Sequence, residues 1–411
     1  MSETSKKKHI TVSGEFNGEK VIFETGRLAP KADAAVMATV GGTSVLVAVV
    51  SAPSKEISDG LPLRVDYEER FYAGGTISGS RFTRREGKPT DEAIVEGRLI
   101  DHAIRPLFSK DFMDETQIIA TALSVDGKNS AGLVAFLATS AALSISGLPF
   151  NGPIVPVRVQ KENKESEVKV SFNESDEHNY LDLVASYIKN GEKVQAIEAH
   201  AHEIPEKELI EAIEISAKES KPLFDLLNEF SKKAGVPARK YEKSWLNREA
   251  IETFHKDVFP RIKEIKSSGI QFKSKEWDDA MKDIESDLTK KYADKYEAAQ
   301  IVAFVGEAEK DFIRELVVNK NERIDGRKME EIRPLSAEVG ILPRVHGSAL
   351  FNRGFTQSLS ITTLASRSQS LLVQSMTGEK EKYYMHHYNF PPFSTGEIGR
   401  VGGANRRAIG H

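Results

Sequence analysis

The stretch Phe23-Glu24-Thr25-Gly26-Arg27-Leu28, together with Val40-Gly41-Gly42-Thr43 and the apolar run from Val45 to Val50, decides the fold because the chain contains it twice. The run from Val45 to Val50 is rich in β-branched residues, which is typical of a strand inside a sheet. Before it, Asn17-Gly18 separates two alternating stretches and predicts a hairpin. The pattern therefore predicts a sheet in the amino-terminal part of the chain.

A second copy of the pattern begins at Ala337 and reads Ala337-Glu338-Val339-Gly340-Ile341-Leu342, then Arg353-Gly354-Phe355-Thr356 and Leu359 to Leu364. An Arg-Arg pair follows in each copy, Arg84-Arg85 and Arg406-Arg407, and we take the two pairs as equivalent. The second copy stops soon after its pair, so we expect its domain to be incomplete. The matching positions are Glu24 with Glu338, Gly26 with Gly340, Leu28 with Leu342, Gly41 with Gly354, and Thr43 with Thr356.

Composition sets broad limits on the protein. A length of 411 residues predicts two or three domains, and a net charge of −4 gives no overall basic field, so a nucleic acid would need a local basic patch. The absence of cysteine excludes disulfides and suits a reducing cytoplasm. Met1 to Lys8 is polar and does not resemble a signal peptide. Ala131 to Phe150 carries no charge, but its small residues and the breaks at Gly147 and Pro149 favour a buried helix over a membrane span.

The remaining pattern divides the chain into three parts. We predict a first α/β core at 9–237, an all-helical module at 238–320 and the start of a second core at 321–411. The predicted elements are a helix capped by Thr90 and ended by Pro106, strands at 117–125 and 154–159, a charged hairpin or loop at 160–177, a helix from 205 that Pro222 kinks or splits and 234–237 ends, and helices across 245–318 with a break at Gly269.

A basic loop is the first candidate site. Arg81-Phe82-Thr83-Arg84-Arg85-Glu86-Gly87-Lys88 combines four cations with one aromatic residue. Arginine forks bind phosphate oxygens, and Phe82 could stack on an unpaired base, which suits single-stranded nucleic acid. The alternative is a solvated loop whose arginines pair with nearby carboxylates.

Two further groups of cations follow. Arg98, His102 and Arg105 share one face of the predicted helix, where they either extend the basic lining or form salt bridges with neighbouring acids. The run from Gly399 to Arg407 places an Arg pair after several glycines, which is typical of a phosphate cradle at a helix start. A metal site at His386, His387 and His411 is less favoured, because histidines beside aromatic residues are usually structural.

At these residues the chain resembles the bacterial polynucleotide phosphorylase family. The resemblance covers residues 9 to 411 in order. Its motifs are 81–89, 98–108 (Arg-Leu-Ile-Asp-His-Ala-Ile-Arg-Pro-Leu-Phe), 146–153, 323–327 (Arg-Ile-Asp-Gly-Arg), 347–351, 387–392 (His-Tyr-Asn-Phe-Pro-Pro) and 406–411 (Arg-Arg-Ala-Ile-Gly-His).

This resemblance implies a duplicated RNase PH-like core of α/β (α+β) type joined by an all-α linker, with the second core truncated. It implies a cytoplasmic homotrimer that degrades single-stranded RNA from its 3′ end during mRNA turnover, using inorganic phosphate and Mg²⁺ and releasing nucleoside diphosphates. It also implies an RNA-degradation complex with an RNase E-type nuclease or a helicase, and no membrane. The RNA-binding residues would be Phe82, Arg84, Arg85, Arg98 and Arg105, and the active-site residues Arg406, Arg407 and His411.

The chain also departs from the family pattern. Thr83 separates Phe82 from Arg84, His102 replaces an expected Arg, and Phe355 stands where the family has Glu. No metal ligand is expected in this portion, because the family's acidic ligands and phosphate-binding serines lie past His411. We therefore expect the 411 residues alone to be inactive. A non-catalytic RNA-binding or scaffold protein derived from this fold is the alternative.

Overall fold

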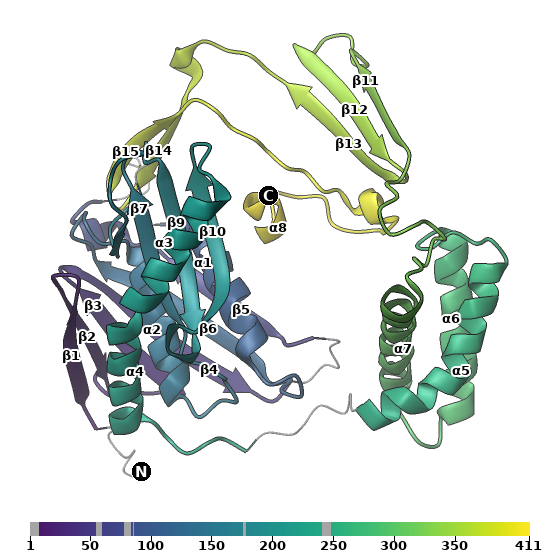
Figure 1. Ribbon diagram of the computed structural model, residues 1–411, viewed down its shortest axis with the longest axis horizontal. Helices are drawn as coiled ribbons and strands as arrows, with labels where there is room; N and C mark the ends of the chain where they lie inside the picture. Colours follow the sequence, from purple (N-terminus) through teal and green to yellow (C-terminus); the bar gives the residue numbers. More distant parts are fainter. Residues whose placement is uncertain (1–7, 55–59, 78–83, 85, 176–177, 241–247) are drawn as a thin grey trace. The chain divides into compact units, whose positions relative to one another are not determined.

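The computed structural model describes residues 8–54, 60–77, 84, 86–175, 178–240 and 248–411 (Figure 1). The described residues form two compact units. One holds residues from 8–54, 60–240 and 371–411, and the other holds 248–370.

A six-stranded sheet forms one layer of the first unit. Its order is β1-β2-β3-β4-β6-β5, and only β5 and β6 run parallel. Asn17 and Gly18 both have positive φ, 48° and 82°, which confirms the predicted hairpin turn. The predicted Val45 strand is confirmed as β4, which has neighbours on both sides. The strands are β1 Ile10–Phe16, β2 Glu19–Thr25, β3 Ala34–Val40, β4 Thr43–Ala52, β5 Leu63–Glu68 and β6 Glu115–Ser124.

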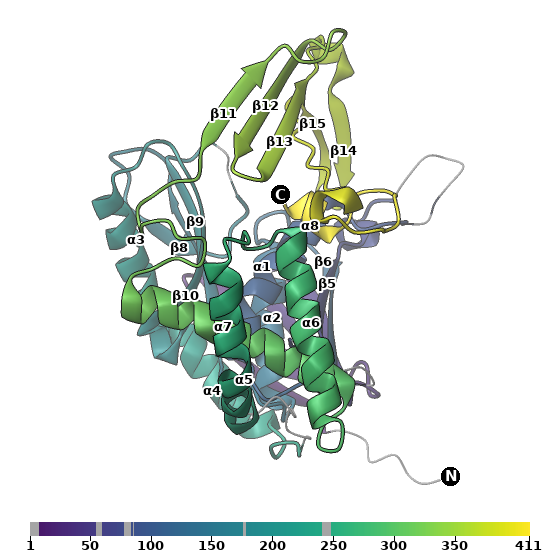
Figure 2. The same ribbon diagram turned by 90° about the vertical axis from the view of Figure 1, so that its right-hand side faces the viewer.

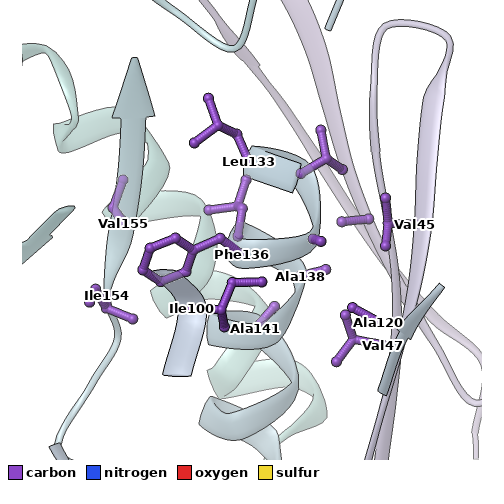
Figure 3. Close-up of a cluster of buried hydrophobic side chains, with 14 of the residues drawn as sticks. Val45, Val47, Ile100, Ala120, Leu133, Phe136, Ala138, Ala141, Ile154 and Val155 are labelled. Carbon is purple, nitrogen blue, oxygen red and sulfur yellow. The ribbon is translucent and has the colours of Figure 1, made fainter. Parts of the chain in front are cut away.

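Helix α2 (Ala131–Ile145) forms the centre of this unit. Every residue of α2 except Ser144 is buried, because the helix packs against β3, β4 and β6 on one side and β7 on the other (Figure 3). Phe136 extends toward Ile154 and Val155, whereas Ala138 faces the sheet that carries Val45. The predicted buried helix is confirmed. No helix within the described residues combines the length and apolar character that a bilayer crossing requires.

A four-stranded sheet covers the other side of α2, in the order β10-β9-β7-β8. The predicted strand at 154–159 is confirmed as β7, but β9 and β10 are not predicted from the sequence. Asp182 interrupts the apolar run of β9, although it is buried in an ion pair with Arg158, 3.1 Å from Nε to Oδ1. The strands are β7 Val155–Lys161, β8 Lys169–Ser171, β9 Leu181–Ile188 and β10 Lys193–Ala201.

The first unit also contains the helices α1 Asp91–Ile104, α3 Glu206–Glu219 and α4 Lys221–Ala234. The Thr90 hydroxyl accepts a hydrogen bond from Ala93 N at 3.0 Å, which confirms the predicted cap of α1. Pro222 lies in the first turn of α4, where proline is tolerated, so the predicted split between two helices is also confirmed.

The second unit contains three packed helices, α5 Arg248–Ser267, α6 Lys275–Tyr292 and α7 Ala298–Lys320 (Figure 2). Gly269, with a φ of 80°, follows the end of α5 and confirms the predicted break. Their apolar faces share one core. It includes Phe254, Val258, Trp277, Ile284, Phe304 and Phe312.

The second copy of the repeat forms a three-stranded antiparallel sheet of β11 Leu335–Val339, β12 Gly347–Arg353 and β13 Thr356–Thr362. Its pairing matches the first copy: Leu335 lies opposite Arg353 as Val21 lies opposite Val40, and Gly347 opposite Thr362 as Ala34 opposite Val49. The turn glycines also match in conformation. Their φ values are 86° at Gly26 and 69° at Gly340, and 56° at Gly41 and 59° at Gly354.

The remaining segment, 371–411, packs with the first unit. It contains the hairpin of β14 Leu371–Ser375 and β15 Gly378–Lys382, and the short helix α8 Arg406–Gly410. Met376, in the turn of this hairpin, is buried. The turn packs so closely on Gly74 that a side chain at that position would collide with the carbonyl oxygen of Met376. The division at 9–237, 238–320 and 321–411 stays a prediction.

Candidate functional site

Helices α1 and α8, labelled in Figure 1, pack against each other. This packing brings two predicted arginines, Arg98 and Arg406, together. Arg98 Nη1 donates to the carbonyl of Arg406 at 3.4 Å. The Arg98 side chain also lies directly against Gly410, where a Cβ atom would collide with Arg98 Nε. Arg406 in turn donates through Nη2 to the carbonyl of Val65, and its Nη1 lies 3.5 Å from Asp66 Oδ1. One hydrogen bond therefore joins two residues that lie 308 positions apart in the sequence.

Arg407 and His411 lie at the two ends of a row of rings. The Arg407 guanidinium carbon is 4.7 Å from the centre of the Phe390 ring, a cation–π distance. Phe390 lies nearly parallel to Tyr388, with 6.0 Å between ring centres, and Tyr388 contacts the His411 ring at 4.7 Å. Tyr388 and Phe390 were not predicted as site residues, although the His-Tyr-Asn-Phe-Pro-Pro motif that contains them was the available signal.

Arg105 is engaged in the fold. Its guanidinium donates to both carboxylate oxygens of Asp101, at 2.8 and 3.0 Å, and to the carbonyls of Leu61 and Leu63 at 2.8 and 2.9 Å. The alternative of an intrahelical salt bridge therefore describes its contacts. A role for Arg105 in RNA binding stays a prediction.

Replacing Arg105 with Ala is expected to lower the free energy of unfolding of the first unit by about 2 kcal/mol, because two backbone carbonyls and a carboxylate lose a charged donor. Calorimetric unfolding would measure the change. The exposed His102, in the last turn of α1, which Arg105 caps, offers a control in His102→Ala. Equal stability of the two variants would contradict the structural role.

The basic loop is only partly described. Arg84 is exposed, whereas Phe82 and Arg85 lie outside the described residues. Glu86, from the same motif, accepts a hydrogen bond from the backbone N of Phe71 at 3.0 Å and lies 3.4 Å from Arg70 Nη1. The loop's acidic residue is thus used to hold the preceding turn.

The proposed equivalence of Arg84-Arg85 and Arg406-Arg407 is wrong. Asn405 caps α8 by accepting from Ala408 N at 2.9 Å, as Thr90 caps α1, whereas Arg84 lies in irregular structure before that cap. A helix cap is a fixed structural landmark, and it gives a different alignment of the copies. Counted from the caps, Arg406 matches Asp91, Arg407 matches Glu92, and His411 matches Glu96.

Glu96 is a second feature that was not predicted. Its carboxylate packs on the first turn of α2, where a Cβ at Gly132 would lie 2.4 Å from Glu96 Cδ, and its Oε2 atom is buried without a hydrogen bond. Burial raises the pKa of Glu96 to about 7, against an opposing effect of Arg158, and the nearby Glu174 and Glu69 raise it further. A carboxylate on the apolar face of α1, between Ala93 and Ile100, was the signal in the sequence.

A cavity of about 300 Å³ lies between α1 and the 371–411 segment of the same unit. Glu96, Lys382, His386 and His387 contribute to its lining. Within the part of the chain that the structure describes, no three His, Asp or Glu residues form a group that could hold a metal ion. Arg98, Arg406 and Arg407 carry guanidinium groups, which are suited to binding anions such as phosphate.

Comparison with known protein families gives two matches. Residues 18–149 and 331–411 match the profile of RNase PH, described as the 3′ exoribonuclease family, domain 1. Residues 250–328 match the RNA-binding domain of polyribonucleotide nucleotidyltransferase. The first match covers both copies of the repeat, and the second covers the helical module.

Curated relatives are similar over nearly the whole chain. A polyribonucleotide nucleotidyltransferase of Caldicellulosiruptor saccharolyticus is 41% identical over 97% of this chain and 56% of its own length. One of Brachyspira hyodysenteriae is 39% identical over 98% of this chain and 56% of its own length. Among solved structures, rice (Oryza sativa) Rrp46 matches 56% of this chain and 98% of its own, with 14% identity and a TM-score of 0.42. The chain spans about half the length of the curated relatives it matches.

Proposed function

Because the chain belongs to the RNase PH family of 3′ exoribonucleases, we propose that the protein is a polyribonucleotide nucleotidyltransferase that degrades single-stranded RNA from the 3′ end. The match of residues 250–328 to an RNA-binding domain supports RNA as the substrate. The observation that carries the proposal is the contact of Arg98 with Arg406, whose neighbour in the chain, Arg407, lies over the Phe390 ring.

The arginines suit phosphorolysis. An oxygen of inorganic phosphate attacks the phosphorus of the terminal linkage, the bond to the preceding 3′ oxygen breaks, and that oxygen takes up a proton as nucleoside diphosphate is released. Negative charge builds on the phosphoryl oxygens in this step, and fixed guanidinium donors stabilise it. We assign Arg406, Arg407 and His411 to the reacting phosphates.

We assign RNA guidance to Phe82, Arg84, Arg85, Arg98 and Arg105. Backbone phosphates would pair with the arginines and a base would stack on Phe82. In this proposal the domains are 9–237, 238–320 and 321–411, the assembly is a cytoplasmic homotrimer, and the process is mRNA turnover. An RNase E-type nuclease or a helicase is the proposed partner class.

Mg²⁺ is the proposed cofactor and would supply charge neutralisation at the phosphates. The described residues contain no group suited to hold it, so the roles above are assigned to this chain's side chains alone.

The test is phosphate-dependent release of nucleoside diphosphate. The protein, expressed from its complete reading frame, is incubated with poly(A) and Mg²⁺ with and without inorganic phosphate. We expect ADP release that rises and saturates with phosphate concentration. RNA binding without ADP release would instead support the non-catalytic RNA-binding alternative, and release of AMP independent of phosphate would show hydrolysis.

A further inference from the structure

We propose that a pocket on the helical module, between α5 and α7, binds one nucleotide of the single-stranded RNA. The inference rests on the proposed function in taking RNA as the ligand, but it concerns a site separate from the arginines of the first unit. The pocket has a volume of about 290 Å³, at the lower end of the range for small-ligand sites, which suits one nucleotide. Its lining includes Arg248, His255, Phe259, Asp311 and Arg314.

Two stacked rings line the pocket. The His255 ring lies 4.4 Å from the Phe259 ring at an angle of 22°, and Phe259 contacts the buried Phe312 edge-on at 5.3 Å. The core therefore holds the two rings in place. Unpaired bases stack on aromatic side chains of this kind.

The orientation of His255 is fixed by a charged pair. Asp311 Oδ2 accepts from His255 Nε2 at 3.0 Å and from Arg248 Nη1 at 2.7 Å. Arg248 compensates the charge of Asp311, so this carboxylate opposes an incoming phosphate less than a free one would. The imidazole plane is set before any ligand arrives, which reduces the entropy lost on binding.

Other groups at the pocket remain available for a ligand. In the portion covered by the structure, Arg314 is exposed and forms no ion pair, and neither does Glu315 beside it. Asn319 adds an amide, and Val318 is 70% exposed. A guanidinium for phosphate, polar groups for base edges and an apolar rim match a nucleotide better than an apolar ligand.

The pocket also lies in the segment that matches an RNA-binding domain. Except for Arg248, the residues named here fall within 250–328, the segment for which RNA binding is proposed above.

The experiment compares Arg314→Ala with Arg261→Ala in the full-length protein. Arg261 lies on α5 of the same helical module, so replacing it with Ala removes the same charge. It pairs with Asp287 at 3.0 Å and does not line the pocket. Affinity for a fluorescein-labelled oligouridylate is measured by anisotropy over a series of salt concentrations. We expect Arg314→Ala to weaken binding about fivefold and to reduce the slope of log affinity against log salt by about 0.7, the value for one lost phosphate contact on a single strand.

A second variant, Val318→Asp, places a negative charge at an exposed position that contributes little to the core, and it should weaken binding similarly. Affinity within twofold of wild type and an unchanged salt slope in Arg314→Ala would overturn the proposal. If Arg314→Ala lost affinity for free ADP but kept its affinity for oligouridylate, the RNA-binding proposal would be overturned in favour of a site for a free nucleotide. A wild type that binds oligouridylate but releases no ADP from poly(A) would refute the proposed catalysis while leaving this comparison valid.

Discussion

Replacing Arg407 with Ala is expected to lower kcat/KM for phosphorolysis of poly(A) at least about 100-fold, the typical loss for one preorganised donor to a developing oxyanion. Arg407 lies over Phe390 and forms no ion pair among the described residues, so its removal should leave the fold intact. Arg407→Lys should recover part of the rate, because it keeps the charge but loses the planar fork.

ADP release measured against phosphate concentration would give the effect on kcat and KM separately. Arg27→Ala is a suitable control, because Arg27 is an exposed arginine of the same unit that lies 3.6 Å from Glu24. A fall of less than threefold in Arg407→Ala, with the control unchanged, would show that Arg407 does not contact the reacting phosphate.

Replacing Glu96 with Gln is expected to remove a large pH dependence of stability in the first unit. Glu96 has a pKa near 7 in the folded state, against 4.5 for an ordinary glutamate, so the folded state binds a proton that the unfolded state has released. The resulting stabilisation is complete below about pH 4.5 and is lost as the pH rises through 7. Over that window wild type should lose about 3 kcal/mol relative to Glu96→Gln.

Calorimetry at several pH values between 5 and 8 would measure this difference. Glu115→Gln, at an exposed position of β6, should keep the wild-type pH dependence. Parallel pH profiles for wild type and Glu96→Gln would contradict the raised pKa of Glu96.

Aligning the two copies by the caps of α1 and α8 connects the predictions for Glu96 and Arg407. Glu96 and His411 occupy matching positions after their helix caps, as do Glu92 and Arg407. The first copy thus has carboxylates where the second has an arginine and a histidine. This exchange agrees with the proposed assignment of phosphate chemistry to the second copy.

Several features of the fold were predictable because they depend on local chemistry. The hairpin follows from Asn17-Gly18, the cap of α1 from Thr90, and the buried helix from an uncharged run of small residues. By contrast, β9 and β10 were missed. The charge of Asp182 in β9 is accommodated inside because Arg158 lies beside it, and the sequence pattern does not show that partner.

The sequence by itself determined the duplicated architecture, the helical module and the family, because glycine positions, helix caps and apolar periodicity act over a few residues. Only the tertiary structure decided which cations are available. It brought Arg98 to Arg406, engaged Arg105 with Asp101 and two carbonyls, and packed the carboxylate of Glu96 against α2. These outcomes depend on contacts between distant segments, and a charge acts on whatever lies near it in space.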